Sequence, residues 1–181
     1  MREILFRGKS VDNDKWIYGF LIQMLDENNT LKTSCIVENM SSFDIVTGKL
    51  KQDYWKVDFE TIGQYTGLCD KNGTKIFEGD IVEFETNINC ITSELKPYWK
   101  DCIEKQYAVG GGTWWVRKEQ AVVQWNSKDG MWDLKVYNNG RYKRKSKLFT
   151  YRESDYIVVG NIHDNPELLG SDTNVGGKLP L

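Results

Sequence analysis

The stretch VDFETIGQYTGLCDKNGTKIFEGDIVEF, residues 57–84, carries the strongest local evidence for the fold. Its centre, Asp70 to Gly73, suits a tight turn, because an Asn-Gly pair adopts positive φ angles easily and the Asp carboxylate can accept hydrogen bonds from the turn backbone. A second reversal is expected at Glu78 to Asp80, and apolar residues stand on both sides of each reversal. The stretch therefore predicts a β-hairpin followed by a strand from Asp80 to Glu85.

The same pattern of apolar runs around polar turns recurs on both sides of this stretch. The runs at 15–25 and 30–38 flank Asp26 to Asn29 and predict a hairpin. The runs 121–125 and 131–137 flank a five-residue loop that ends in Gly and predict another. A short apolar run at 156–162 reads as a buried strand.

Signals for helix are few. Asn165, Pro166 and Glu167 combine an N-cap residue, a first-turn proline and an early carboxylate, which favours one short helical turn that ends at Gly170. Residues 93–107 form the other helix candidate, because Pro97 could begin a helix there. Many short strands with little helix predict a mainly β protein.

Composition excludes several classes of protein. With 181 residues, 40% hydrophobic residues and a net charge of −2, the sequence is that of an ordinary globular chain and not of a disordered, fibrous or strongly basic one. The N-terminus lacks the apolar core of a signal peptide, and no run is long enough to span a bilayer. The four cysteines, which include no C-x-x-C pair, are read as free thiols in a reducing compartment. We therefore expect a cytoplasmic protein with no membrane partner, no cofactor and no metal.

Residues 57–84, together with IVVGNIHDNPELL at 157–169, resemble the YopX protein family of phages and prophages. The opening ILFRGKSVDNDKWIYGFL, residues 4–21, is also similar to the start of that family, with an Arg near a first strand, a short acidic loop and W-x-Y-G. The chain departs from the family pattern at His163, where an aromatic residue such as Tyr is expected, and in the long segment 86–118.

The resemblance implies a mainly β fold with an SH3-like barrel component, encoded by mobile elements of bacteria, and it brings no established activity and no catalytic residues. We expect one YopX-like domain over 1–170, in which a hairpin region (1–56) packs on a barrel (57–170), followed by a flexible tail at 171–181. The barrel is expected around residues 57–84, 119–137 and 155–163.

A dense run of cations is the best functional candidate in the sequence. Residues 1–90 carry 10 basic and 15 acidic side chains, whereas residues 91–181 carry 14 basic and 11 acidic ones. Five of the latter cations lie in the seven residues from 141 to 147, with aromatic residues inside and just upstream of the run. Cations can bind a phosphate backbone while aromatic rings stack on bases. The nucleic-acid site predicted on this basis comprises Arg141, Tyr142, Lys143, Arg144, Lys145, Lys147 and Trp132, with Trp125 and Tyr137 nearby.

Besides nucleic-acid binding, the sequence allows two other functions and a purely structural role for the basic run. The ordinary structural interpretation of the run is a solvated loop between two strands. Seven Trp and nine Tyr are many for this length, and exposed aromatics anchor protein interfaces, so a module that self-assembles or binds a host or phage protein is the second hypothesis.

A small metal-dependent hydrolase or nuclease is the third hypothesis, with Asp70, Glu78 and Asp80 as its carboxylates. We expect these side chains instead to diverge at the surface and to accept bonds from their own turns. A Cys69–His163 nucleophile pair lacks a third, orienting residue, and residues 110–112 lack the Lys-Ser/Thr of a phosphate loop. We therefore assign no catalytic residues.

Overall fold

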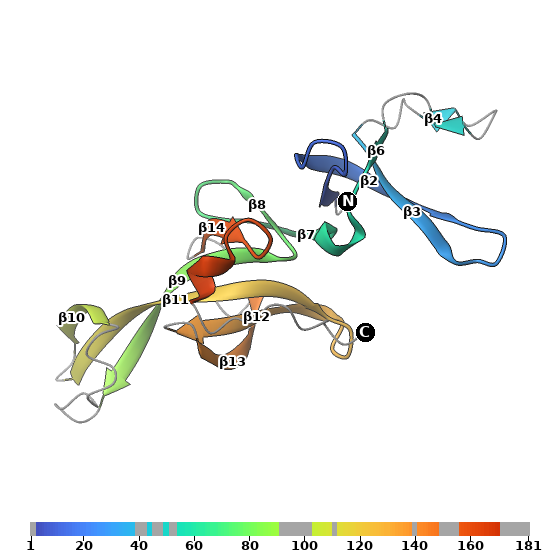
Figure 1. Ribbon diagram of the computed structural model, residues 1–181. Coiled ribbons are helices and arrows are strands. Elements are labelled where there is room, and N and C mark those ends of the chain that lie inside the picture. The colour runs from blue at the N-terminus through green and yellow to red at the C-terminus, as the bar shows by residue number, and fades with distance from the viewer. Residues whose placement is uncertain are drawn as a thin grey trace. The chain divides into compact units, whose positions relative to one another are not determined.

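The computed structural model describes residues 3–38, 43–44, 49–50, 54–90, 103–109, 112–138, 141–148 and 156–170 (Figure 1). The chain divides into two compact units. Unit 1 comprises Met1–Leu68 and Lys75–Glu78, and unit 2 comprises Cys69–Thr74 and Gly79–Leu181. Each unit contains one six-stranded β-sheet, and the described helices are short 3₁₀ turns.

The sheet of unit 1 has the strand order β6-β3-β2-β1-β7-β8. Its strands are β1 (Phe6–Lys9), β2 (Trp16–Leu25), β3 (Leu31–Val37), β6 (Tyr54–Lys56), β7 (Gly63–Cys69) and β8 (Lys75–Phe77). A separate two-stranded pair consists of β4 (Phe43–Asp44) and β5 (Lys49–Leu50), and a 3₁₀ turn, η2 (Phe59–Thr61), precedes β7. On one face of the sheet Ile17, Ile36 and Val57 form a buried cluster.

Two hairpin turns have the same hydrogen-bond pattern. In the turn after β2, the amides of Asn28 and Thr30 donate to Asp26 Oδ1 at 2.8 and 2.9 Å. In the turn after β7, the amides at the equivalent positions, 72 and 74, donate to Asp70 Oδ1 at the same 2.8 and 2.9 Å. The residue in the left-handed region is Asn29 in the first turn (φ 61°) and a glycine in the second (φ 82°). Both predicted hairpins are confirmed.

Gly19 of β2 lies directly against the backbone at the end of β3. A Cβ at this position would clash with the backbone carbonyl of Val37 and lie 3.0 Å from the Cα of Glu38. We expect Gly19→Ala to lower the free energy of unfolding by about 2 kcal/mol, as overpacking does, because backbone atoms of a paired strand cannot shift independently. Urea denaturation of the purified variant measures the loss.

Gly8→Ala, on the neighbouring strand β1, is the matched control for Gly19→Ala. The three atoms nearest to its Cβ would be side-chain atoms of Val57 and Ile36, at 3.0–3.3 Å. Side chains can yield by a few tenths of an ångström, so a smaller loss is expected. Equal losses for the two variants would contradict the assigned backbone contact.

The sheet of unit 2 has the order β13-β12-β11-β9-β14, with β10 also paired to β11. Its strands are β9 (Asp80–Cys90), β10 (Ile103–Val109), β11 (Gly112–Asn126), β12 (Met131–Asn138), β13 (Arg141–Lys147) and β14 (Ile157–Asn161), and η6 (Pro166–Leu169) follows. The hairpin predicted across residues 126–130 is present, because β11 pairs with β12 from Gln120↔Tyr137 to Asn126↔Met131.

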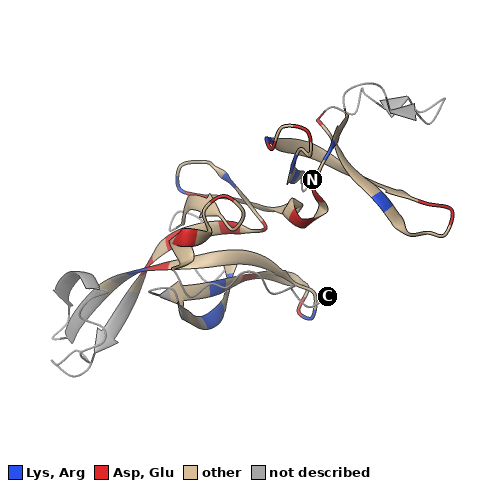
Figure 2. Ribbon diagram, in the orientation of Figure 1, with Lys and Arg blue, Asp and Glu red and all other residues tan. Residues whose placement is uncertain are grey.

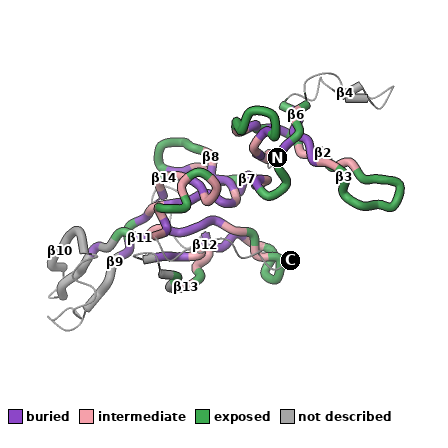
Figure 3. The backbone as a smooth tube through the Cα atoms, viewed as in Figure 1, coloured by how far each residue is buried: buried purple, intermediate pink, exposed green. Residues whose placement is uncertain are grey.

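The sheet of unit 2 is apolar on both faces near its centre. Since side chains alternate along a strand, the register places Val82, Val123 and Leu134 on one face, all fully buried. We call this the core face; Figure 3 shows buried residues along β9, β11 and β12. On the opposite face Ile81, Val122 and Tyr137 pack with Leu169 of η6, and we call it the η6 face.

The predicted mainly β class is confirmed, and so is the short helical turn that ends at Gly170. The helix predicted over 93–107 is wrong for residues 103–107, which belong to strand β10; residues 93–102 lie outside the described residues. The prediction relied on Pro97 as a possible helix start, but pairing with β11 holds residues 103–107 in a strand. A single barrel around residues 57–84, 119–137 and 155–163 is not confirmed. Strands within 80–84, 119–137 and 157–161 share the sheet of unit 2, which is open in its described part, whereas residues 63–69 and 75–77 belong to the sheet of unit 1.

Candidate nucleic-acid interface

The basic run 141–147 forms strand β13, at the end of the described sheet path in unit 2. It pairs antiparallel with β12 from Asp133↔Lys147 to Asn138↔Arg141, with an irregularity after Val136. Lysines on an edge strand also discourage edge-to-edge association of sheets. Figure 2 marks the cations on β12 and β13 in blue. The side chains of Arg141 and Lys143 lie outside the described residues.

Arg144 is held by a buried carboxylate. Its guanidinium donates two hydrogen bonds to Glu119, at 3.0 and 2.8 Å. The Glu119 side chain is fully buried, whereas that of Arg144 is 40% exposed. A bidentate pair of this kind fixes the geometry of both groups, so the charge of Arg144 is already compensated inside the protein.

Lys147 is compensated as well. Its ammonium lies 2.6 Å from Asp129 Oδ2 and 3.0 Å from Asp133 Oδ1. The hydrogen bond to Asp129, followed by that to Asp133, raises the pKa of Lys147, and the same contact with Lys147 lowers the pKa of Asp129. The two carboxylates therefore more than neutralise the single positive charge of Lys147.

Lys145 is different, because the residue opposite it on β12 is another lysine, Lys135. Lys145 is exposed and Lys135 is partly exposed. On the same face, the next pair along the hairpin is Tyr137↔Tyr142, beyond the irregularity after Val136, and the ammonium of Lys135 lies 5.7 and 5.6 Å from the two ring centroids. We call these four residues the Lys–Tyr cluster. It lies on the η6 face, since Tyr137 belongs to the apolar cluster there.

The tryptophans lie on the opposite face of the sheet. Trp132 and Trp125 are paired in the register and pack edge to face, with centroids 5.0 Å apart. Trp132 is three residues from Lys135, so strand alternation directs it to the core face, where it is only 2% exposed. It has no open ring face on which a base could stack. The structure thus brings together two lysines and two tyrosines, and Lys135 was missed by the sequence analysis.

Two of the three carboxylates of the enzyme hypothesis do not lie at the surface as expected, whereas Glu78 is partly exposed. Asp70 accepts amide bonds from its own turn, as predicted, but it also accepts one from Val158 of β14, at 3.0 Å. Asp70 and Asp80 are buried, so the prediction that they lie at the surface is wrong. Burial raises the pKa of Asp70, but the amides of Val158, Thr74 and Asn72 outweigh it and the net shift is downward. The fold therefore stabilises the ionised form of the Asp70 carboxylate.

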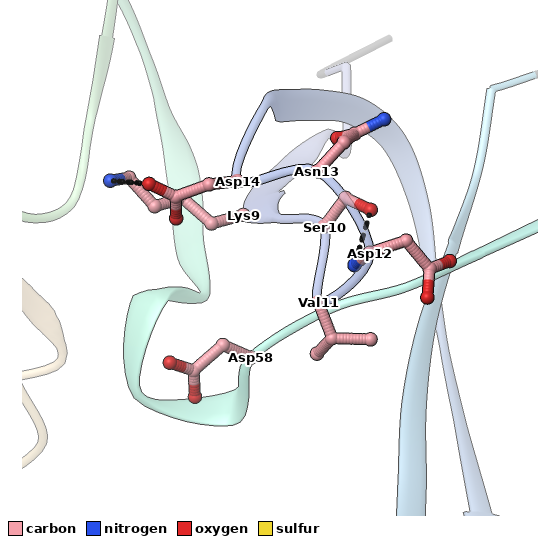
Figure 4. Close-up of a pocket in the computed structure, with 7 residues that line it drawn as sticks. All are labelled: Lys9, Ser10, Val11, Asp12, Asn13, Asp14 and Asp58. Carbon is pink, nitrogen blue, oxygen red and sulfur yellow. Dashed lines mark hydrogen bonds and ion pairs between the residues drawn. The ribbon is translucent and has the colours of Figure 1, made fainter.

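A hollow of about 410 Å³ lies in unit 1 beside the β1–β2 loop, between residues 9–14 and Asp58. Figure 4 shows Asp14 turned toward Lys9, with which it forms an ion pair at 3.5 Å, and Asp12 directed to the other side of the loop. The amide of Asp12 donates to the hydroxyl of Ser10 at 3.3 Å. In the part of the chain that the structure describes, no three His, Cys, Asp or Glu side chains gather to hold a metal ion.

Comparisons with known proteins place the chain in a family. The model of the YopX protein matches residues 5–170. Among solved structures, the chain is similar to protein EF1440 from Enterococcus faecalis, with 23% identity, a TM-score of 0.45, and 93% of this chain and 99% of that chain covered. No curated protein matches. Among the described residues no helix is long and apolar enough to cross a membrane. Because the family model spans nearly the whole sequence, the chain belongs to the YopX protein family.

Proposed function

We propose that the protein is a non-enzymatic binding module that takes nucleic acid on the Lys–Tyr cluster. The observation that carries this proposal is the direct pairing of Lys135 with Lys145 across neighbouring strands. Neither lysine forms an ion pair within the described residues, in contrast to Arg144 and Lys147 beside them. Among the described cations of β12 and β13, the two lysines of the cluster are thus those that no carboxylate contacts in an ion pair.

Opposed lysines are unfavourable in the free protein. Like charges directly opposite on paired strands repel and destabilise the sheet. A polyanion that lies over both ammonium groups replaces the repulsion with two favourable contacts and releases the counterions of its phosphates. The net charge of −2 provides no long-range attraction for such a ligand, so binding depends on this local pair.

Family membership supports further parts of the proposal. We propose that the protein is encoded by a phage or prophage, acts in the cytoplasm of the bacterial host, and contains an SH3-like barrel component to which the strands of unit 2 contribute. Small β barrels can bind ligands on their open strand surfaces.

Exposed aromatic residues in unit 1 favour a protein partner or a second copy as the alternative. Tyr18 and Phe20 of β2 are 46% and 41% exposed, and Tyr54 of β6 is 37% exposed. Phe20 and Tyr54 lie on either side of Val37 in the register, so they share one face of the sheet. Co-purification of the tagged protein from infected cells distinguishes bound nucleic acid from a bound protein.

The double variant Lys135→Gln/Lys145→Gln tests the primary proposal. It should bind oligonucleotides more weakly than the parent, and the slope of log K against log salt should become shallower by about 1.4, because each lost phosphate contact removes about 0.7 for a single strand. Fluorescence anisotropy titrations at several salt concentrations measure this slope.

The control for that variant is Lys71→Gln/Lys128→Gln, which removes the same charge from two exposed lysines of unit 2 outside the cluster. It should keep the parent slope. Equal slopes for all three proteins would place binding elsewhere, and the absence of binding to single or double strands at low salt would overturn the proposal.

A further inference from the structure

We infer that the Lys–Tyr cluster selects single-stranded over double-stranded nucleic acid, with Tyr142 as the residue that stacks on a base. This inference rests on the proposed function and adds the class of ligand to it. Its basis is the half-exposed ring of Tyr142, which packs against the buried Tyr137 and has the ammonium of Lys135 5.6 Å from its centroid.

Tyr142 presents a ring to solvent in a defined orientation. Its side chain is 50% exposed, whereas Tyr137 opposite it is 9% exposed and packs with Ile81, Val122 and Leu169. The two tyrosine rings meet edge to face, with centroids 6.3 Å apart and an angle of 73°. The buried ring therefore anchors the exposed one, and a base that stacks on Tyr142 has little conformational entropy of the ring to overcome.

Lys135 links the ring to the phosphate contacts. Its ammonium lies near both tyrosine rings, and it directly opposes Lys145 on β13. One nucleotide can thus place its base on Tyr142 and its phosphate over the lysine pair. Stacking platforms beside cations are the usual way in which proteins bind single strands without reading sequence.

A duplex cannot use this arrangement. Away from its ends, a duplex has its bases stacked on one another and exposes only their edges in the grooves, so the face of a tyrosine ring meets no base face there unless a nucleotide is unpaired. The lysine pair alone would still attract a duplex. Beyond the lysine pair, however, the carboxylates of Asp133 and Asp129 contact Lys147. They limit how far the positively charged surface extends along β13 toward a longer duplex.

Tyr142→Ala is the decisive variant, tested with a short mixed-sequence DNA strand and with the duplex of the same sequence. We expect the parent to prefer the single strand, and Tyr142→Ala to weaken single-strand binding about tenfold while it leaves duplex binding unchanged. Tyr142→Phe should bind like the parent, because the ring is retained.

Trp125→Ala is the matched control, since Trp125 is 45% exposed but lies on the core face of the same sheet. It should leave single-strand binding unchanged, with circular dichroism confirming that each variant is folded. Equal affinity of the parent for strand and duplex, or equal effects of Tyr142→Ala and Trp125→Ala, would overturn the inference. In that case a salt slope that still depends on Lys135 and Lys145 would leave the proposed function standing, whereas no binding at all would overturn both.

Discussion

Asp70→Ala should lower the free energy of unfolding by about 4 kcal/mol, the largest loss that we expect from a single substitution. The Asp70 carboxylate accepts three backbone hydrogen bonds, from Asn72, Thr74 and Val158, and each bond to a charged acceptor contributes about 1.5 kcal/mol. Removal of the carboxylate leaves those amides without this acceptor in a position that is only 6% exposed. Urea denaturation followed by tryptophan fluorescence measures the change.

Asp26→Ala is an internal control for that prediction. Asp26 accepts the same two amide bonds from its own turn, at the same distances, but it is exposed. The bond to Val158 and the burial of the carboxylate are therefore the features that distinguish Asp70. We expect the Asp26 variant to lose about 1–2 kcal/mol, in the range for lost capping bonds. Equal losses at the two positions would show that the contact with β14 contributes nothing.

The contribution of Asp70 should also depend on pH. Its pKa is lower in the folded protein than the value near 3.9 of an unfolded chain. A group with a depressed folded pKa stabilises the protein above its unfolded pKa, and this stabilisation is lost as pH falls through the folded pKa. The difference in stability between the parent and Asp70→Ala should therefore be constant from neutral pH to about pH 5 and shrink below about pH 4. A difference that grows on acidification would contradict the assignment.

Arg144→Met should cost about 3 kcal/mol of stability. Glu119 is fully buried and loses both charge-assisted bonds in this variant, and breaking a buried pair from one side typically costs about 3–5 kcal/mol. We expect the lower end of that range, because the Arg144 side chain is 40% exposed and water can reach part of the site. Chemical denaturation measures the loss.

The double variant Glu119→Met/Arg144→Met tests whether the stability lost in Arg144→Met comes from leaving the Glu119 charge buried without Arg144. Replacing both charges with apolar side chains removes the buried carboxylate that has lost its guanidinium, so much of the lost stability should return. Lys75→Met is the surface control, because its pair with Glu3 is well exposed on both sides and should contribute less than about 1 kcal/mol. A double variant that is less stable than Arg144→Met would argue against a stranded charge as the cause.

Local sequence chemistry predicted the turns and the class of fold because the interactions concerned are short in sequence. Asp26 and Asp70 each bind amides two and four residues ahead, and Asn126 accepts from Lys128 in the third turn. Such acceptor–amide pairs can be predicted from the sequence because donor and acceptor are only two to four residues apart. The same holds for the η6 turn between Asn165 and Gly170, which depends on a proline at its start.

The candidate site could be predicted only in part, because its composition depends on strand register. Lys135 lies outside the basic run and enters the site only because β12 and β13 pair with an irregularity near Val136. Hairpin geometry was the available signal: runs 131–137 and 141–147 are close enough to pair, which places Lys135 near the run. Alternation along β12, with a period of two, could likewise have separated Trp132 from Lys135.

The sequence by itself determined that this protein is a mainly β member of the YopX family, with its hairpins at defined turns, because these features rest on residues adjacent in the chain. Only the tertiary structure decided which charges remain available. Arg144 meets Glu119 across 25 residues, and Asp70 meets Val158 across 88. Such contacts follow from which strands are neighbours and in what register, and the free energy that selects one pairing comes from burial summed over a whole sheet.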